Sequence, residues 1–167
     1  MPKTPAEANI KLVMLTTKPA DWRKPKIAEL NAGIDISTKI LKSDYKFGPT
    51  ASDTINEAAL SAAGNSKDFG ASNFDASITP WRYHDGTGKV ALTEDAVYQA
   101  LKVKGTEVYM YERRGAHHTQ AFAAGDIVTG AWLTTDNPTP VNDLSGYLKS
   151  TIALGHRDFV LDVAVTA

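Results

Sequence analysis

Hydrophobic and polar residues alternate at every second position in many short runs of the chain, which is the pattern of half-buried β-strands. These runs are rich in β-branched and aromatic residues, and Gly, Pro, Asn and Asp bound them. The alternation therefore predicts a chain dominated by strands. We expect strands over residues 9–15, 34–41, 73–83, 106–112, 126–134, 147–154 and 159–165.

Most of the predicted strands have one apolar and one polar face. In the last of them Phe159 and Leu161 share the apolar face, while Asp162 lies on the other. Leu148 and Ile152 likewise share the apolar face of the preceding strand. Half-polar strands of this kind are typical of antiparallel sheets with one solvated face. The sequence thus predicts a mainly β fold, a two-sheet antiparallel β-sandwich or barrel.

One segment departs from the period of two and predicts a single flanking α-helix over about residues 93–104. Val97 and Leu101 recur there at helical spacing behind Thr93, a residue type favoured at the N-cap. Gly105 follows the segment, and glycine commonly ends a helix in the left-handed conformation. The apolar stripe is narrow, so we expect this helix to cover one face or one open end of a sheet.

The segment 43–72 is long, rich in Ala, Ser, Gly, Asn and Asp, and poor in large apolar residues, with only a weak strand signal around residues 50–57. A structureless insert of this length is unusual in a compact domain unless it acts outside the domain. We therefore expect a long loop over about 43–72 that is mobile in a lone subunit and becomes ordered against another molecule. The competing interpretation is that the segment folds back on its own domain.

The length of 167 residues suits one domain and leaves little room for a second, so we expect a single domain over residues 1–167. No window approaches the roughly 18 apolar residues of a membrane span, and the first residues lack the apolar core of a secretion signal. Cysteine is absent, which excludes disulfides and thiolate metal ligands.

The net charge of −1 gives no bulk attraction to nucleic acid or anionic lipid, but the charge is unevenly distributed. Residues 1–48 contain nine Lys or Arg and five Asp or Glu, whereas the rest contain nine and fourteen. A basic first part and an acidic remainder can attract each other between subunits. Ordinary surface variation explains the same counts.

The residues form no recognisable catalytic or metal-binding motif. Gly88 and Lys89 resemble the end of a phosphate-binding loop, but Val90 stands where Ser or Thr is required, so a hairpin turn explains them better. His117 and His118 are adjacent, and in an extended segment they point to opposite sides, which favours exposed loop residues over a shared metal. We expect no enzymatic activity, no cofactor and no metal site.

Six segments carry a resemblance that periodicity does not explain. They are PAEANIKLVML at 5–15, ELNAGIDIS at 29–37, TINE at 54–57, TPWRY at 79–83, TDNP at 135–138 and GYLK at 146–149. In this order, from end to end, they resemble the major tail tube proteins of long-tailed (siphovirus-type) phages of actinobacterial hosts. None of the segments is a chemical motif, so the specificity of the resemblance comes from their order and coverage.

The resemblance implies a tail tube domain without the C-terminal immunoglobulin-like domain that some relatives carry. It implies subunits that form stacked hexameric rings, with sheets joined into a continuous β-lined channel. The channel would hold the tape measure protein during assembly and conduct DNA during ejection without specific binding. The other implied partners are the tail terminator and distal tail proteins, with assembly in the host cytoplasm and a final place in the virion tail.

Two sets of residues are candidates for the contacts of such a tube. Polar residues on wet strand faces are candidates for the channel lining, because acidic or neutral walls let DNA slide whereas basic walls hold it. The lining candidates are Asp75, Ser77, Thr79, Asp162 and Thr166. Acidic residues of the long loop are expected to meet the basic early segment of a neighbour. The candidates for this contact between rings are Lys42, Lys46, Asp53, Glu57, Leu60 and Asp68.

Two other functions remain open on the sequence. One is a monomeric small-ligand-binding β-barrel, which a stable monomer with a closed apolar cavity would indicate. The other is the inner tube protein of a contractile injection or secretion apparatus, which shares the fold and needs a sheath partner.

Overall fold

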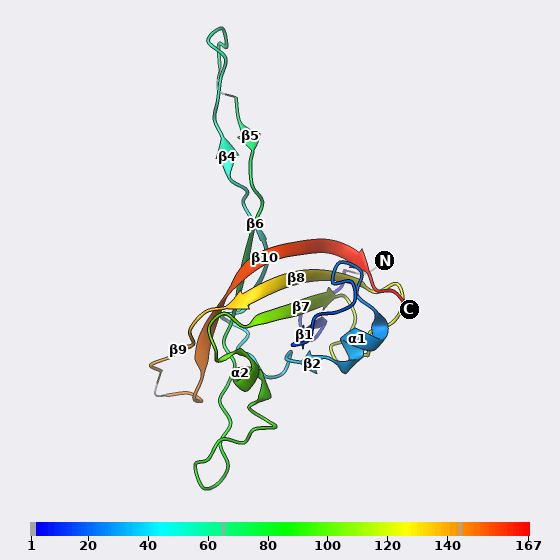
Figure 1. The fold of residues 1–167 in the computed structure, drawn as a ribbon, viewed down its shortest axis with the longest axis vertical. Coiled ribbons are helices and arrows are strands. Elements are labelled where there is room, and N and C mark those ends of the chain that lie inside the picture. The colour runs from blue at the N-terminus through cyan, green and yellow to red at the C-terminus, as the bar shows by residue number, and fades with distance from the viewer. Residues whose placement is uncertain (1–2, 65, 144) are drawn as a thin grey trace.

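An antiparallel sheet, two short helices and a projecting arm make up the computed structural model, which describes residues 3–64, 66–143 and 145–167 (Figure 1). The helices are α1 (Ile27–Ala32) and α2 (Ala96–Leu101). The strands are β1 (Ile10–Leu15), β2 (Ile34–Asp35), β3 (Lys46–Thr50), β4 (Thr54–Ile55), β5 (Asp68–Phe69), β6 (Asn73–Ile78), β7 (Glu107–Arg114), β8 (Ile127–Thr135), β9 (Thr139–Pro140) and β10 (Ser150–Ala164).

One continuous sheet contains eight of these strands. Its order is β2-β1-β7-β8-β10-β6-β3, and β9 pairs with β10 beside this path. Every pair of these strands is antiparallel. β4 and β5 form a separate two-stranded ladder. The prediction of a mainly β, antiparallel fold is confirmed, with the difference that the strands expected in two sheets are joined into one.

The sheet curves around a main apolar core and carries a second core on its opposite face. The main core takes side chains from β1, β3, β6, β7, β8 and β10, and α2 adds Val97 and Leu101. The second core lies against β1, β7 and β8, and α1 contributes Leu30 to it. β1 is therefore buried on both faces, since Leu12 belongs to the main core and Val13 to the second.

β10 replaces two predicted strands with one long strand, and irregularities interrupt its alternation. The strands predicted after residue 146 fuse, and the pairing of β10 with β8 shifts register twice, the second time between Val160 and Val163. A bulge inserts an unpaired residue and so changes which side chains face the core. The predicted apolar face is therefore wrong at Leu161, which is 46% exposed. It is also wrong at Leu148, which lies before the first residue of β10 and is 66% exposed.

The predicted strand over 34–41 ends early because its apolar residues turn into the main core. β2 has only two residues, and beyond it Ile36 and Ile40 are buried without belonging to a strand. Ser37 stabilises this turn, because its hydroxyl accepts a hydrogen bond of 2.9 Å from the backbone N–H of Leu12. β6 ends early in the same way, at Ile78 instead of residue 83.

The predicted helix exists as α2 but is shorter, and α1 was outside the prediction. α2 begins after Asp95 instead of Thr93, since residues 92–95 form a turn. Gly105 has the predicted left-handed backbone, with φ of 85°. α1 begins where the Glu29 carboxylate accepts a hydrogen bond of 3.3 Å from the backbone N–H of Lys26. Its six residues are too few to show helical periodicity in the sequence.

The segment predicted as a structureless loop over 43–72 forms most of a β-hairpin, so that prediction is wrong. β3 pairs with β6 as far as Thr50 and Asn73, and β4 pairs with β5 farther out. Figure 1 shows residues 51–72, which we call the arm, leaving the sheet as a long projection. Nearly all described side chains of the arm are exposed. Because neither face is buried, no alternation of apolar and polar residues marks its strands.

Candidate assembly surfaces

The arm presents large apolar side chains to solvent. Ile55 in β4 is 47% exposed, Phe69 in β5 is 74% exposed, and Leu60 near the tip is fully exposed. A single exposed apolar residue needs no explanation. Three of them on a narrow hairpin that contributes nothing to either core make the arm a candidate surface for contact with another molecule.

The residues predicted to join rings lie on the arm and just before or within β3. Four of these residues lie on the arm and are exposed, namely Asp53, Glu57, Leu60 and Asp68. Lys42 forms an ion pair of 3.6 Å with Glu7, and Lys46 forms one of 3.4 Å with Asp75. All four side chains are about half exposed or more, and exposed ion pairs add little stability. Both lysines therefore retain their attraction for a carboxylate of another copy.

The residues predicted to line the channel fall in two separate places, and one of them is buried. Asp75 and Ser77 lie on β6, whereas Asp162 and Thr166 lie at or beyond the end of β10 that has no pairing with β6. Thr79 is fully buried where the chain leaves β6, and its hydroxyl is hydrogen-bonded within the protein. The prediction that Thr79 belongs to a wet face is therefore wrong.

Two of the strand edges that lack a partner within the described residues belong to β10 and β3. From Gly155 to Ala164 β10 pairs with β8 alone, because β6 pairs only with Ile152–Leu154 before it leads away towards the arm. β3 is the last strand of the sheet order, and its Pro49 has no N–H to donate, as is typical of edge strands. Unpaired strand edges are surfaces on which another chain can add a strand.

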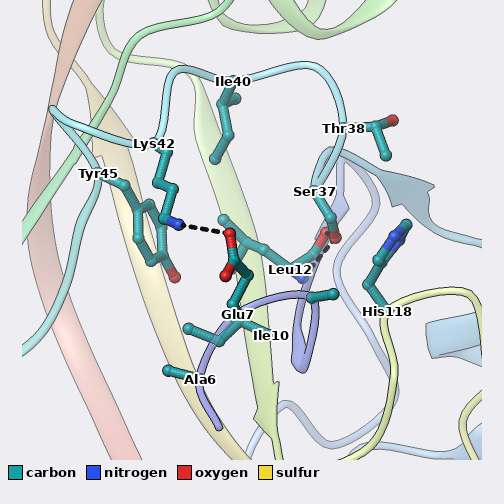
Figure 2. A pocket seen from close by; sticks show the side chains of 11 residues that line it. Ala6, Glu7, Ile10, Leu12, Ser37, Thr38, Ile40, Lys42, Tyr45 and His118 are labelled. Atoms are coloured by element: carbon teal, nitrogen blue, oxygen red, sulfur yellow. Dashed lines mark hydrogen bonds and ion pairs between the residues drawn. The ribbon is translucent and has the colours of Figure 1, made fainter.

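A cavity of about 260 Å³ opens between the start of the chain, β1 and the turn before β3 (Figure 2). Ile10, Leu12 and Ile40 give it apolar walls. Lys42 and Glu7 lie at its rim, where Figure 2 shows their charged groups facing each other.

A buried hydrogen-bond network fixes one wall of the cavity. The Tyr45 hydroxyl donates to the Glu112 carboxylate, whose side chain is 3% exposed, and Nε of Arg114 donates to the same carboxylate over 2.5 Å. Burial raises the pKa of Tyr45 far above its usual value, and the charge and hydrogen bond of Glu112 raise it further. Tyr45 therefore stays neutral, and its ring holds a fixed place in the cavity wall.

The histidine pair lies in a turn, in agreement with the prediction of loop residues, and there its rings do not point to opposite sides as they would in an extended segment. The ring centroids of His117 and His118 are 4.7 Å apart. Over the described ranges no three His, Cys, Asp or Glu side chains are placed to hold a metal ion together. The hairpin turn at Gly88 is confirmed, since the backbone N–H of Asp85 donates to the carbonyl of Lys89 over 2.7 Å. In the part of the chain that the structure describes, neither helix has the length and apolar character to span a membrane.

Sequence reasoning misses the cavity and most of the apolar surface of the arm. Ile10 and Leu12 have the pattern of strand residues, and nothing in the sequence shows that a cavity lies beside them. Phe69 offers a usable signal. It is a large aromatic residue within a stretch of small and polar residues, which has no alternation that would bury it.

Comparison with known proteins gives one family and a shared fold. A family model described as phage tail tube protein matches residues 1–167. A chain of the cryo-EM structure of the anti-feeding prophage (AFP) baseplate, 6-fold symmetrised, has a TM-score of 0.56 at 9% identity, with 98% of each chain covered. A chain of the hybrid solid-state NMR and cryo-EM structure of the SPP1 tail tube has a TM-score of 0.52 at 12% identity, with 95% of this chain and 79% of that chain covered. At these identities the likeness shows the fold alone, and no curated protein matches the chain.

Proposed function

Because the chain belongs to the phage tail tube protein family, we propose that its copies form hexameric rings that stack into the tube of a long-tailed phage. The chain is a structural subunit of a tail tube, and its place is the tail of the virion. A structural role of this kind requires no active site. The proposal accordingly includes no catalytic activity, cofactor or metal.

The observation that carries the proposal is the arm. Ten residues from Ala51 to Leu60 extend over about 33 Å at roughly 3.3 Å per residue. Ordering such a segment has an entropic cost, and within one subunit little apolar burial offsets it. A neighbouring ring supplies the missing burial. A projection on one copy that meets a different surface on the next is a head-to-tail contact, which repeats without limit along an axis.

The open strand edges support the closure of each ring. The free part of β10 and the outer edge of β3 are two different edges of the same sheet. One copy can therefore pair its β10 with the β3 of its neighbour. Such pairing would continue the sheet around a ring. We propose that the channel inside this ring is lined by four exposed or half-exposed polar residues, namely Asp75, Ser77, Asp162 and Thr166.

The channel explains the partners that we propose. The tape measure protein occupies it during assembly in the host cytoplasm, and DNA passes through it during ejection. Two of the four proposed lining residues are acidic and none is basic, and the nearby Lys46 is paired with the Asp75 carboxylate, so the lining offers phosphates little that would retain DNA. The ends of the tube meet the tail terminator and the distal tail proteins.

A second candidate function is the inner tube of a contractile injection or secretion apparatus. The fold shared with a chain of the anti-feeding prophage baseplate favours it. It predicts that the outer wall of the tube binds a sheath protein. A monomeric ligand-binding barrel is less well supported, because the cavity of Figure 2 is open to the surface and a monomer has no use for the arm.

Replacing the arm tests the proposal. Residues 51–72 are exchanged for Asn-Gly, a two-residue turn that connects the paired ends of β3 and β6. We expect the unaltered protein to form tubes visible by electron microscopy, and the variant to stay folded by circular dichroism and to form no tubes. Tubes formed by the variant would show that the arm does not make the stacking contact. A stable monomer of the unaltered protein at every concentration would contradict the whole proposal.

A further inference from the structure

The cavity of Figure 2 is the surface that receives the arm. Resting on the proposed stacking of rings, we infer that Leu60 of one copy inserts into the cavity beside Ile10 and Ile40 of a copy in the next ring. Leu60 is the most exposed large apolar side chain of the described chain. The cavity is an apolar recess that its own subunit leaves unfilled.

The size of the cavity suits a single aliphatic side chain. Its volume of about 260 Å³ lies below the roughly 300–1,000 Å³ of pockets that hold drug-sized ligands. Leu12 and Ile40 belong to the main core, so an inserted side chain would extend a core that is already packed. When an apolar side chain meets such walls, apolar surface on both partners is removed from water, and this is the main driving force for association.

The walls of the cavity are held in place before any partner arrives. Tyr45 is fixed through its hydrogen bond to buried Glu112, and Ser37 is fixed through the backbone of Leu12. A preformed recess loses little conformational freedom when it is filled. The conformational cost of docking therefore falls mainly on the arm.

The rim of the cavity carries an exposed cation, Lys42, with which a carboxylate of the arm can pair. Within residues 51–72 the charged residues are Asp53, Glu57, Lys67 and Asp68, so the arm is acidic. Lys42 lies at the rim of the cavity, and its pair with Glu7 is almost fully exposed on both sides. Glu57 is three residues from Leu60 along the arm. When Leu60 enters the cavity, Glu57 comes within reach of Lys42, and the pair orients the approach.

The occupant is a second copy because the arm cannot fill the cavity of its own subunit. Figure 1 shows the arm extending away from the sheet, whereas the cavity is lined by residues 6–12, 37–45 and His118, none of which belongs to the arm. Leu60 is fully exposed and does not line the cavity, so it does not fill the cavity of its own subunit. A second subunit displaced along the arm brings its own cavity to the tip.

The natural absence of cysteine allows a direct test by cross-linking. Ser61→Cys places a thiol next to Leu60 without removing it, and Ala6→Cys places one on the lining of the cavity. The two variants are purified separately, mixed, assembled and oxidised. We expect a disulfide-linked dimer from the mixture and none from either variant alone, because a disulfide forms only when Cβ atoms come within about 3.5–4.5 Å.

A second mixture separates this inference from the proposed stacking. Ser61→Cys is mixed with Leu92→Cys, whose segment Figure 1 places at the end of the molecule opposite the arm, where residue 92 is 70% exposed. Tubes that cross-link through residue 92, or through neither position, would refute the insertion of Leu60 into the cavity. The proposed stacking of rings would then still hold. Failure of the unaltered protein to assemble would overturn both.

Substitutions at Leu60 and in the lining of the cavity give an independent readout. Leu60→Asp places a charge at an apolar contact and should raise the protein concentration needed for tube formation at least about tenfold, whereas Leu60→Met should change it far less. Ala6→Trp should mimic Leu60→Asp by filling the cavity. All three variants leave the cores untouched, so each is expected to fold, and normal assembly of Leu60→Asp would contradict the inference.

Discussion

Asp95 ties α2 to the segment before it, and replacing it by Ala should be strongly destabilising. Its side chain is completely buried and accepts hydrogen bonds from Arg82 at 3.0, 3.2 and 3.3 Å, from the backbone N–H of Tyr83 at 3.0 Å and from Gln99 at 2.7 Å. Arg82 also lies over the ring of Tyr98, 3.6 Å from its centroid.

The magnitude follows from the charge that Asp95→Ala leaves behind. The Arg82 side chain is 19% exposed, so it would keep most of its burial without a counter-ion. Removing one partner of a buried ion pair costs about 3–5 kcal/mol. For a chain of this size each kcal/mol lowers Tm by roughly 2–4 °C, so we expect a Tm lower by about 6–20 °C. Glu94→Ala is the matched control, because the neighbouring Glu94 side chain is exposed and should change Tm by little.

The same carboxylate makes stability depend on pH. Burial alone would raise the pKa of Asp95, but the hydrogen bonds from Arg82, Gln99 and Tyr83 and the charge of Arg82 together lower it. A folded-state pKa below the unfolded value of about 3.9 adds stability above that pH, and the contribution is lost as the pH falls through the folded value. Asp95→Ala should therefore lose less stability than the unaltered protein between pH 5 and pH 2.

Urea denaturation of the two variants at pH 7 and at pH 3 measures both effects. Circular dichroism follows the transition, and analytical ultracentrifugation confirms that monomers are compared. If Asp95→Ala matches Glu94→Ala at pH 7, or if its deficit is unchanged at pH 3, the network does not stabilise the fold as we argue.

Three further predictions concern other parts of the molecule. Gly130→Ala should destabilise the monomer by about 1–3 kcal/mol in thermal melts, because the added Cβ would lie 2.7 Å from the ring of Tyr111, which is itself hydrogen-bonded and buried; an unchanged Tm would refute the overpacking. Tyr45→Phe should cost about 1–3 kcal/mol in urea denaturation, because buried Glu112 loses a donor, and an effect below about 0.5 kcal/mol would show that this hydrogen bond is dispensable. Asp162→Lys should leave tubes visible by electron microscopy but slow DNA ejection from assembled virions, since each hexameric ring gains six cations in the channel; normal ejection would place Asp162 outside the lining.

The strand content is predictable from the sequence because buried strands carry their own signal. β7 and β8 lie close to their predicted ranges, since their apolar residues are held by the two cores. The faces of β10 are not predictable in the same way. A bulge near Asp162, where φ is 50°, shifts the alternation, and no local residue pattern announces it.

The arm shows why the candidate assembly surfaces are only partly predictable. Its length and its lack of core residues are visible in the sequence, and they led to the prediction of a segment that acts outside the domain. Its hairpin structure leaves only the weak strand signal around residues 50–57, which overlaps β4, because β4 and β5 pair through backbone groups and bury neither face. The cavity depends on contacts between residues as distant as Ile10 and Tyr45, which no local pattern encodes.

Cryo-electron microscopy of the purified protein, concentrated until it assembles, tests the central claim most directly. We predict tubes of stacked six-fold rings in which the arm, residues 51–72, crosses from one ring into the next. A protein that remains monomeric at every concentration, or rings whose arms lie entirely against their own subunits, would contradict this account.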